Sequence, residues 1–385
     1  MSSASALFEG KKILHVIGDS KFGGDAVYMI ELSKMVREVG AKVYICTTTD
    51  ETIELAEFYG FDVLKHPKIL REISPVKDLF ALFQMRKVCK EHQFDLVHTH
   101  TSKGGVIGRI GAKLGGIKSV IHTIHGFAFH ENSSFVEKLI YKNVERLAAR
   151  FSDMAISVNN EDRILAIDEK IVQQDKVTTI YNGVSKERID SDEVQNIRKL
   201  YGIDETTIIV GTLSRFSYQK DPQTFLKAAF RALEINPDLV FIYAGDGPML
   251  NECKDILASS AFSEQIIFTG FVTNAADYLK SFDIFITTAL YEGLPIALLE
   301  AMYAGKAIIA TDAKGNRECV NSSNALINQI SDYDGLASNI LAFANSPSLR
   351  EKLGVRAKKT FYQNFTVEQM RVNTLNVYRK VMFGQ

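Results

Sequence analysis

Short apolar runs alternate with longer segments of helical periodicity along almost the whole chain of 385 residues. The first apolar run, from Lys12 to Gly18, is typical of a strand buried in a parallel sheet. A segment from about Ala26 to Val39 follows it, with apolar residues at helical spacing. The same alternation predicts strands at 42–47, 62–64, 96–99, 119–124, 154–158, 177–181, 207–213, 239–244, 265–268, 284–288, 306–311 and 325–327. Strands that alternate with helices favour parallel sheets covered by helices on both faces.

The strands fall into two series that meet near residue 190, and the chain is long enough for two domains. We therefore predict an α/β fold of two tandem Rossmann-like, doubly wound domains. The predicted bounds are 1–187 and 188–366, and a final helical segment, 367–385, could pack back on either domain. Ligands of such sheets bind beyond the carboxyl ends of the strands, so we expect a site in a cleft between the domains.

Composition narrows the possible functions. A net charge of −1 argues against a general nucleic-acid binder, and there is no apolar run of about 18 residues that could span a membrane. The start of the chain lacks the features of a secretory signal, and its four cysteines are scattered without a CxxC pair. These features favour a reducing, cytoplasmic location.

The segment from Thr287 to Asp312 has the pattern of a strand, a tight turn, a helix and a second strand. Glu292 lies at the turn, and Glu300 lies within an otherwise apolar helix that begins near Pro295. A carboxylate in such a helix is costly unless it points at a partner or at solvent. We interpret both carboxylates as ligands for the hydroxyl groups of a nucleotide-sugar, although a solvated face could also explain Glu300.

Two cations, Arg215 and Lys220, follow a predicted strand and precede a helix that Pro222 opens. Fixed cations beside a helix N-terminus are suited to a diphosphate. Solvated surface charges are the alternative explanation.

Glycines follow several predicted strands. Gly23 and Gly24 precede a helix, so they could admit an anion or simply form a tight turn. Gly245 and Gly247 resemble only half of a dinucleotide-binding motif, but they could line a nucleotide site. Phe271 and Val272 end the next strand, where main-chain groups could contact a base.

Histidines gather at two strand ends, in HTH at 98–100 and in HTIHGFAFH at 122–130. We interpret them as structural rather than zinc-binding, because no Cys, Asp or Glu lies beside them at ligand spacing. Strand alternation places Thr123 and His125 on one face and His122 on the other, and His125 is the best candidate for a site residue. The Asp-x-Asp pattern at 190–192 lies in a polar connector, so we do not interpret it as a metal site.

An amphipathic helix is predicted over 135–151. Four basic residues recur along it at every fourth position, and we call them the basic stripe: Lys138, Lys142, Arg146 and Arg150. With its apolar neighbours the stripe could lie on an anionic membrane surface, or it could be an ordinary solvated face.

Together these motifs resemble retaining glycosyltransferases of family 4, which have the GT-B fold, and the resemblance covers nearly the whole chain. The most specific motif is Glu292 and Glu300 separated by seven residues in EGLPIALLEAM. The surroundings are similar to bacterial enzymes that build capsule, exopolysaccharide or lipid-linked oligosaccharide. Lys314 departs from the family, which often has glycine there.

The resemblance implies a role for each motif. Glu300 would bind the ribose, Glu292 and main-chain groups of Leu294, Pro295 and Ile296 the donor sugar, and Arg215 and Lys220 the diphosphate. Gly23 and Gly24 would lie near the diphosphate or the acceptor, His125 near the reacting centre, and the last helix on the first domain. No metal or other cofactor would be needed, because the two cations would stabilise the leaving group.

The resemblance also implies the partners. The donor would be a UDP-sugar, with an N-acetylhexosamine as the first expectation. The acceptor would be a polyprenyl-diphosphate-linked saccharide at the inner face of the cell membrane. Three alternatives remain: a transferase with a soluble acceptor, a UDP-GlcNAc 2-epimerase-like isomerase and a non-catalytic binding protein. An isomerase would need acid and base carboxylates in the first domain, where the candidate residues are histidine and glycine.

Overall fold

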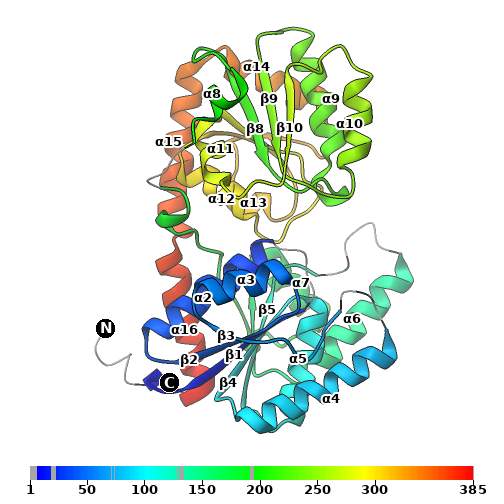
Figure 1. Cartoon of the computed structure of the whole chain (residues 1–385), viewed down its shortest axis with the longest axis vertical. Coiled ribbons are helices and arrows are strands. Elements are labelled where there is room, and N and C mark those ends of the chain that lie inside the picture. The colour runs from blue at the N-terminus through cyan, green and yellow to red at the C-terminus, as the bar shows by residue number, and fades with distance from the viewer. Residues whose placement is uncertain are drawn as a thin grey trace. The chain divides into compact units, whose positions relative to one another are not determined.

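A computed structural model describes residues 7–18, 23–70, 72, 74–127, 129, 134–190 and 195–384. The chain forms two compact units (Figure 1). Unit 1 comprises Met1–Asn182 together with Val367–Gln385, and unit 2 comprises Gly183–Thr366. The last helix is therefore part of the same unit as the beginning of the chain.

Unit 1 contains a parallel sheet with the strand order β3-β2-β1-β4-β5-β6-β7. The order reverses between β1 and β4, which makes this the switch point of a doubly wound sheet. Its strands are β1 (Lys12–Ile17), β2 (Lys42–Cys46), β3 (Asp62–Leu64), β4 (Leu96–His100), β5 (Ser119–Ile124), β6 (Met154–Ser157) and β7 (Val177–Thr179). Its helices are α2 (Gly24–Glu38), α3 (Asp50–Phe58), α4 (Pro75–His92), α5 (Ser102–Leu114), α6 (Phe135–Ala149), α7 (Asn160–Asp168), the 3-10 turn η1 (Gln174–Lys176) and α16 (Val367–Phe383).

The C-terminal helix α16 packs against α2 and β5. Met370, Val377 and Tyr378 of α16 are buried in the same core as Ile13 and Ile121 of the sheet. The Tyr378 hydroxyl oxygen lies 2.6 Å from Nδ1 of His98, which joins positions 280 residues apart in sequence. One face of the unit 1 sheet is therefore covered by helices from both ends of the chain.

Unit 2 repeats the design with the strand order β10-β9-β8-β11-β12-β13, and its switch point lies between β8 and β11. Its strands are β8 (Ile209–Leu213), β9 (Val240–Ala244), β10 (Ile266–Gly270), β11 (Ile284–Thr287), β12 (Ala307–Thr311) and β13 (Leu326–Asn328). Its helices are η2 (Lys186–Arg188), α8 (Ile197–Tyr201), η3 (Tyr218–Lys220), α9 (Pro222–Leu233), α10 (Leu250–Ala258), α11 (Ala275–Ser281), α12 (Ile296–Tyr303), α13 (Asn316–Cys319), α14 (Tyr333–Ala344) and α15 (Pro347–Asn364).

The structure confirms the predicted fold class, since it contains each of the predicted strands in two parallel, doubly wound sheets. The strands could be predicted from the sequence because both sheets are covered on both faces. Strands of such sheets are almost uninterrupted apolar runs. One local detail differs: Pro295 is the N-cap residue of α12 and does not lie in its first turn. Within the described residues, no helix combines the length and hydropathy that crossing a membrane requires.

Candidate functional site

The loops that follow β8 and β11 are held together at the switch point of unit 2. The Thr288 hydroxyl, just after β11, donates to the main-chain oxygens of Lys220 at 2.8 Å and Asp221 at 3.0 Å. The amide of Leu290 donates to the main-chain oxygen of Gln219 at 2.8 Å. The predicted diphosphate segment and the predicted sugar-binding turn are thus neighbours at the carboxyl ends of adjacent strands, where ligands of such sheets bind.

Glu292 is buried at this point and forms an ion pair with Lys220. The side-chain amide of Gln219 donates to the other carboxylate oxygen at 3.1 Å and to the main-chain oxygen of Tyr291 at 2.9 Å. The amide of Glu292 donates to the main-chain oxygen of Lys314 at 2.9 Å. Sequence reasoning assigned Lys220 and Glu292 to different parts of a ligand, whereas the structure pairs them with each other.

Glu300 lines a pocket of about 260 Å³ in unit 2. The pocket is formed by η2, by the segment after β10 with the start of α11, and by α12; its lining residues are Arg188, Ile189, Thr273, Asn274, Ala275, Ala276, Asp277, Leu279 and Glu300. Glu300 is buried and forms an ion pair with Arg188. Oδ1 of the buried Asp277 has no hydrogen-bond partner. The pocket is therefore lined by an ion pair and by a carboxylate oxygen that can still accept a hydrogen bond, a combination suited to a polar ligand.

Sequence reasoning missed Arg188, Asp277 and Asn274. Arg188 lies in the polar connector, where nothing in the local pattern distinguishes it from a solvated charge. Phe271 and Val272, which we predicted to contact a base, directly precede the pocket segment but do not line it. Leu294 and Pro295 are buried and Ile296 is partly buried where α12 begins, on the helix that carries Glu300.

The glycine loop 245–248 supports the segment that carries Arg215. Its main chain accepts from the amide of Phe216 at 3.0 Å, through the oxygen of Asp246. A Cβ at Gly247 would overlap the main-chain oxygen of Phe216, and one at Gly245, where φ is +153°, would overlap that of Ser214. These two glycines allow close approach of two main-chain segments, which is a more specific role than lining a nucleotide site.

The candidate residues of unit 1 lie beyond the carboxyl ends of β1 and β5. Gly23 is the N-cap residue of α2, and Gly24 is its first residue. His125 follows β5 directly and is partly exposed. Residues 19–22, which connect β1 to Gly23, lie outside the described residues, as do positions 191 and 192 of the Asp-x-Asp pattern. Asp190 of that pattern accepts a hydrogen bond of 2.7 Å from the Tyr303 hydroxyl.

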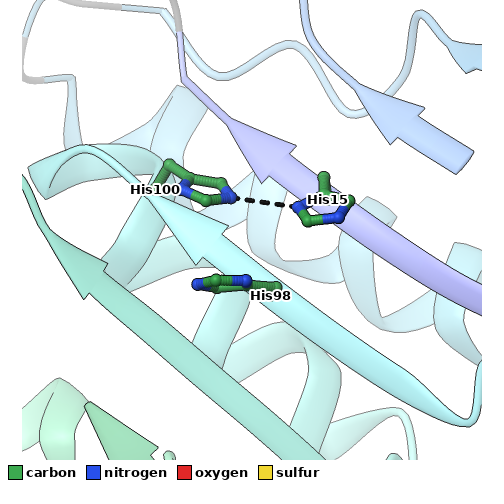
Figure 2. A group of neighbouring side chains, drawn as sticks. All are labelled: His15, His98 and His100. Atoms are coloured by element: carbon green, nitrogen blue, oxygen red, sulfur yellow. Dashed lines mark hydrogen bonds between the residues drawn. The ribbon is translucent and has the colours of Figure 1, made fainter. Parts of the chain in front are cut away.

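Three buried histidines of unit 1, His15 on β1 with His98 and His100 on β4, form a cluster (Figure 2). Nδ1 of His15 lies 3.1 Å from Nε2 of His100, and Nδ1 of His100 lies 3.2 Å from Nε2 of His125. His98 lies between two hydroxyl oxygens, that of Tyr378 at 2.6 Å and that of Thr123 at 2.7 Å. These contacts confirm that Thr123 and His125 share one face of β5, as the strand alternation predicts.

Burial keeps this cluster neutral. It lowers the pKa of His15 to about 3, and it lowers the pKa of His125 to about 4 although the negative charge of Asp25 opposes the shift. Burial and neighbouring histidines hold the pKa of His98 and that of His100 well below the usual value. At His15, His98 and His100 a buried imidazolium would lose its hydration without the compensating charge of a nearby carboxylate, so the neutral form is favoured.

The nitrogens of His15, His98 and His100 lie within 4.8 Å of one another, which makes them the metal-ligand candidate among the described residues. The group contains no carboxylate or thiolate, so the charge of a divalent ion would remain uncompensated in a buried site. Both ring nitrogens of His98 already contact hydroxyl groups, and a metal would displace one of them. The chemistry of the cluster therefore favours neutral, hydrogen-bonded imidazoles.

Half of the basic stripe of α6 is engaged in contacts within the protein. Lys142 forms an ion pair with Glu169 at 2.6 Å, and Arg146 donates to the main-chain oxygen of the same residue at 2.6 and 2.9 Å. Beneath the helix, the buried Arg109 of α5 pairs with Glu145 at 2.7 Å. Two of the four cations thus fasten α6 to the end of α7, which weakens the stripe as an electrostatic surface.

Large apolar side chains are exposed on α4 and α6, the two helices that pack against α5. On these two helices the side chains that are at least half exposed are Val76, Leu79, Phe80, Phe83, Phe135, Val136, Ile140 and Leu147. Single exposed apolar residues are common, whereas contiguous apolar patches mark interaction sites, so these eight residues are candidates for contact with a partner surface. We call these eight residues the apolar face.

Comparison with known proteins gives the same assignment for both halves of the chain. Residues 22–188 match the family model "Glycosyltransferase Family 4", and residues 193–360 match "Glycosyl transferases group 1". The UDP-Gal:alpha-D-GlcNAc-diphosphoundecaprenol alpha-1,3-galactosyltransferase of Escherichia coli is 33% identical over 283 residues, which are 71% of this chain and 73% of that protein. The N-acetyl-alpha-D-glucosaminyl L-malate synthase of Bacillus anthracis is 23% identical over 368 residues, 94% of each chain.

A solved structure shows the same fold over nearly the whole chain. HepE from Anabaena, crystallised with UDP and glucose, superposes with a TM-score of 0.83 at 20% identity and covers 96% of this chain and 100% of its own. The two doubly wound sheets, the Glu292 and Glu300 motif and the family matches agree with one another. The chain therefore belongs to family 4 of the glycosyltransferases and is an enzyme with the GT-B fold.

Proposed function

We propose that this glycosyltransferase moves a hexosyl group from a UDP-sugar to a polyprenyl-diphosphate-linked saccharide, without a metal ion and with retention of configuration. The observation that carries the proposal is the arrangement of two carboxylate–cation pairs in unit 2, Glu292 with Lys220 and Glu300 with Arg188, the second of them lining the pocket. A nucleotide-sugar presents hydroxyl groups, which carboxylates can bind, and a diphosphate, which cations can bind.

The nucleoside is assigned to the pocket. Glu300 can accept hydrogen bonds from both ribose hydroxyls, and the pocket's size of about 260 Å³ suits a pyrimidine nucleoside. The galactosyltransferase relative is named for UDP-Gal, and HepE was crystallised with UDP and glucose, which supports uridine as the base. A galactosyl or N-acetylhexosaminyl donor is consistent with these relatives.

The leaving group is assigned to Arg215 and Lys220. Cleavage of the sugar–phosphate bond develops negative charge on the diphosphate, and fixed cations can stabilise that charge in place of a metal. Retention would follow from attack on the same face, with the departing phosphate taking the acceptor proton. Glu292 would then bind the donor sugar, and His125 would contact that sugar near the reacting carbon.

The lipid-linked acceptor is assigned to the side of unit 1 that carries the apolar face. The Escherichia coli relative is named for a diphosphoundecaprenol-linked acceptor, and such a lipid remains in a membrane. Exposed Phe80 and Phe135 can insert at the interface of an anionic bilayer while nearby cations contact the headgroups. The enzyme would then act peripherally at the inner face of the cell membrane.

The donor assignment is tested by calorimetric titration with UDP, GDP and ADP and with their sugar conjugates. We expect UDP to bind most tightly and Glu300→Gln to weaken UDP binding by about tenfold or more, roughly 1.4 kcal/mol. Glu234→Gln, which alters an exposed ion pair elsewhere in unit 2, is the matched control and should bind normally. Preference for GDP or ADP would contradict the uridine assignment.

The reaction is tested with radiolabelled UDP-galactose and UDP-N-acetylhexosamines in the presence of GlcNAc-diphosphoundecaprenol. Transfer in excess EDTA, with an alpha linkage in the product, is the expected result. L-malate is the competing acceptor, because the Bacillus anthracis relative is named for it. A new epimer formed without acceptor would indicate an isomerase, and activity abolished by EDTA would contradict the metal-free mechanism.

The membrane assignment is tested by sedimentation with vesicles of phosphatidylglycerol and phosphatidylcholine. The double variant Phe80→Ser and Phe135→Ser should lose most of the bound fraction. Phe58→Ser is the matched control, since Phe58 on α3 is 80% exposed, as Phe135 is, and is not part of the apolar face. Equal binding of all three proteins would contradict a membrane role for α4 and α6.

A further inference from the structure

Three imidazoles form a continuous hydrogen-bonded chain across β1, β4 and the end of β5. We call His15, His100 and His125 the histidine chain. Its two links join Nδ1 of His15 to Nε2 of His100 at 3.1 Å, and Nδ1 of His100 to Nε2 of His125 at 3.2 Å. Figure 2 shows the first link, with the His15 and His100 rings approaching each other from neighbouring strands.

Neutral imidazoles in such a chain must all donate in the same direction. Each neutral ring has one N–H and one lone pair, and each N···N link needs one of each. If His15 donates through Nδ1, His100 must donate through Nδ1 to His125, and His125 then carries its own proton on Nδ1. In the opposite direction, His125 donates through Nε2 and His15 carries its proton on Nε2.

The inner end of the chain decides between the two directions. Nε2 of His15 is buried and has no hydrogen-bond partner. The inward direction would place an N–H there without an acceptor, whereas the outward direction leaves only a lone pair unused. Orphaned buried N–H groups are rare and costly, so the outward direction is favoured.

The groups around the chain do not reverse this choice. His98 stacks beside His15 and His100, but its nitrogens contact the hydroxyls of Tyr378 and Thr123. Nδ1 of His122 lies near Oγ1 and the main-chain oxygen of Thr99. Tyr28 of α2 packs against the rings of His100 and His125 edge to face, and so it contributes packing. The negative charge of Asp25 raises the pKa of His125, which concerns a second proton on that ring and not which nitrogen carries the first.

We propose that His100 is a positioning residue that holds His125 in its Nδ1–H form, so that His125 offers a hydrogen-bond donor at the ring atom outside the chain. This inference rests on the proposed function for its catalytic meaning, because His125 is there assigned to the donor sugar. A fixed donor can hold a sugar oxygen in place, but it cannot remove a proton at that atom. The histidine chain thus excludes general-base catalysis by Nδ1 of His125.

The tautomer is measured directly by NMR on the full chain labelled with ¹⁵N-histidine at pH 7. Long-range ¹H–¹⁵N correlation spectra distinguish a protonated ring nitrogen from a bare one, and the His125 signals are identified by their loss in His125→Gln. An unconstrained histidine favours the Nε2–H form, so a pure Nδ1–H spectrum for His125 is the distinctive expected result. The exposed His66 serves as the internal reference.

Two variants test whether the chain is responsible. In His100→Leu and in His100→Phe, which both remove the partner of Nε2 of His125, the His125 signals should move toward the Nε2–H form, while those of His66 should stay unchanged. Either variant suffices if the other fails to fold. The proposal is overturned if wild-type His125 is an Nε2–H or mixed species, if it stays purely Nδ1–H in the variants, or if the purified protein holds a stoichiometric metal that EDTA removes from these rings.

Kinetics then separate this proposal from the proposed function. If wild-type His125 is the Nδ1–H form, His100→Leu should lower kcat by about tenfold and leave the KM for the UDP-sugar nearly unchanged, because His100 would act on the reacting centre only through His125. A change of the His125 tautomer in this variant with unchanged kcat would overturn the catalytic meaning of the tautomer. Failure to turn over UDP-sugars at all would contradict the proposed function while leaving the NMR result standing.

Discussion

At the scale of single residues, the proposed chemistry depends most directly on the ion pair of Lys220 and Glu292. Glu292 is buried, and Lys220 supplies its counter-charge. We expect Lys220→Ala to lower kcat/KM by 10²-fold or more, about 2.7 kcal/mol, because the leaving diphosphate loses a cation. The measurement is steady-state transfer from the UDP-sugar.

Arg231→Ala is the control for that experiment. Arg231 is a half-exposed cation of unit 2 that pairs with Glu234 and Asp334, and exposed pairs contribute little. Turnover by this variant should match that of the wild type. Near-normal kcat/KM in Lys220→Ala would contradict the assignment of Lys220 to the diphosphate site.

Tyr378 is a second residue whose contribution, in this case to the free energy of unfolding, can be measured by a single substitution. Burial raises the pKa of its hydroxyl well above the usual value, so the group stays protonated beside Nδ1 of His98. Tyr378→Phe leaves that buried nitrogen unsatisfied, and we expect a loss of about 1–3 kcal/mol in the free energy of unfolding. Urea unfolding followed by circular dichroism measures it. Tyr218→Phe, at an exposed site, should change the same quantity by less than about 0.5 kcal/mol.

The sequence predicted which residues gather at the switch point of unit 2 but not how they pair. Glu292, Lys220 and Arg215 were recognisable because they directly follow strands, where a parallel sheet places its ligands. Arg188 was not recognisable, because its partner Glu300 is 112 residues away in sequence. Pairing across such a separation depends on tertiary structure, and a single sequence carries no local signal of it.

At the scale of elements, the glycine loop 245–248 and the loop after β8 act as one support for Arg215. Gly247→Ala would place a Cβ against the main-chain oxygen of Phe216, which cannot move without displacing the Arg215 segment. We expect weaker UDP binding and a loss of about 1–3 kcal/mol in the stability of unit 2. Calorimetric titration and urea unfolding measure the two effects.

Gly202→Ala is the matched substitution within unit 2. A Cβ there meets nothing within 4 Å, although φ is +65°, so it reports only the cost of the left-handed backbone. That cost is about 1–2 kcal/mol. Gly202→Ala should therefore bind UDP normally, and equal losses of UDP affinity in the two variants would contradict the supporting role of the glycine loop.

The elements themselves were the most predictable level of this molecule. Strands buried on both faces are nearly continuous apolar runs, so the sequence alone predicts where they lie. The basic stripe of α6 shows the limit of periodicity: spacing placed four cations on one side of a helix, but Glu169 on α7 engages two of them. The exposed apolar residues of the same helix are the part of it that we propose to contact the membrane.

At the scale of the whole molecule, the chain has all eight histidines before position 131, so unit 2 contains none. The cluster in unit 1 is held neutral by burial, with the pKa of His15 lowered to about 3. Below pH 6.5 the unfolded chain binds protons that the folded unit 1 does not bind. The buried histidines therefore make their full contribution to the free energy of unfolding of unit 1 above about pH 6.5. This contribution falls as the pH drops toward the pKa values of the folded state.

We therefore expect acid to destabilise the two units unequally. Between pH 7 and pH 5, His15 alone should cost unit 1 about 2 kcal/mol, and His98, His100 and His122 act in the same direction. Hydrogen exchange read by mass spectrometry should show protection falling in β1, β4, β5 and α16, after correction for the intrinsic exchange rate, while β8 and β11 change less. His15→Phe should flatten the pH dependence of unit 1 by about 2 kcal/mol without altering that of unit 2. Equal acid sensitivity of the two units would show that carboxylates, which both contain, govern the response rather than the buried histidines.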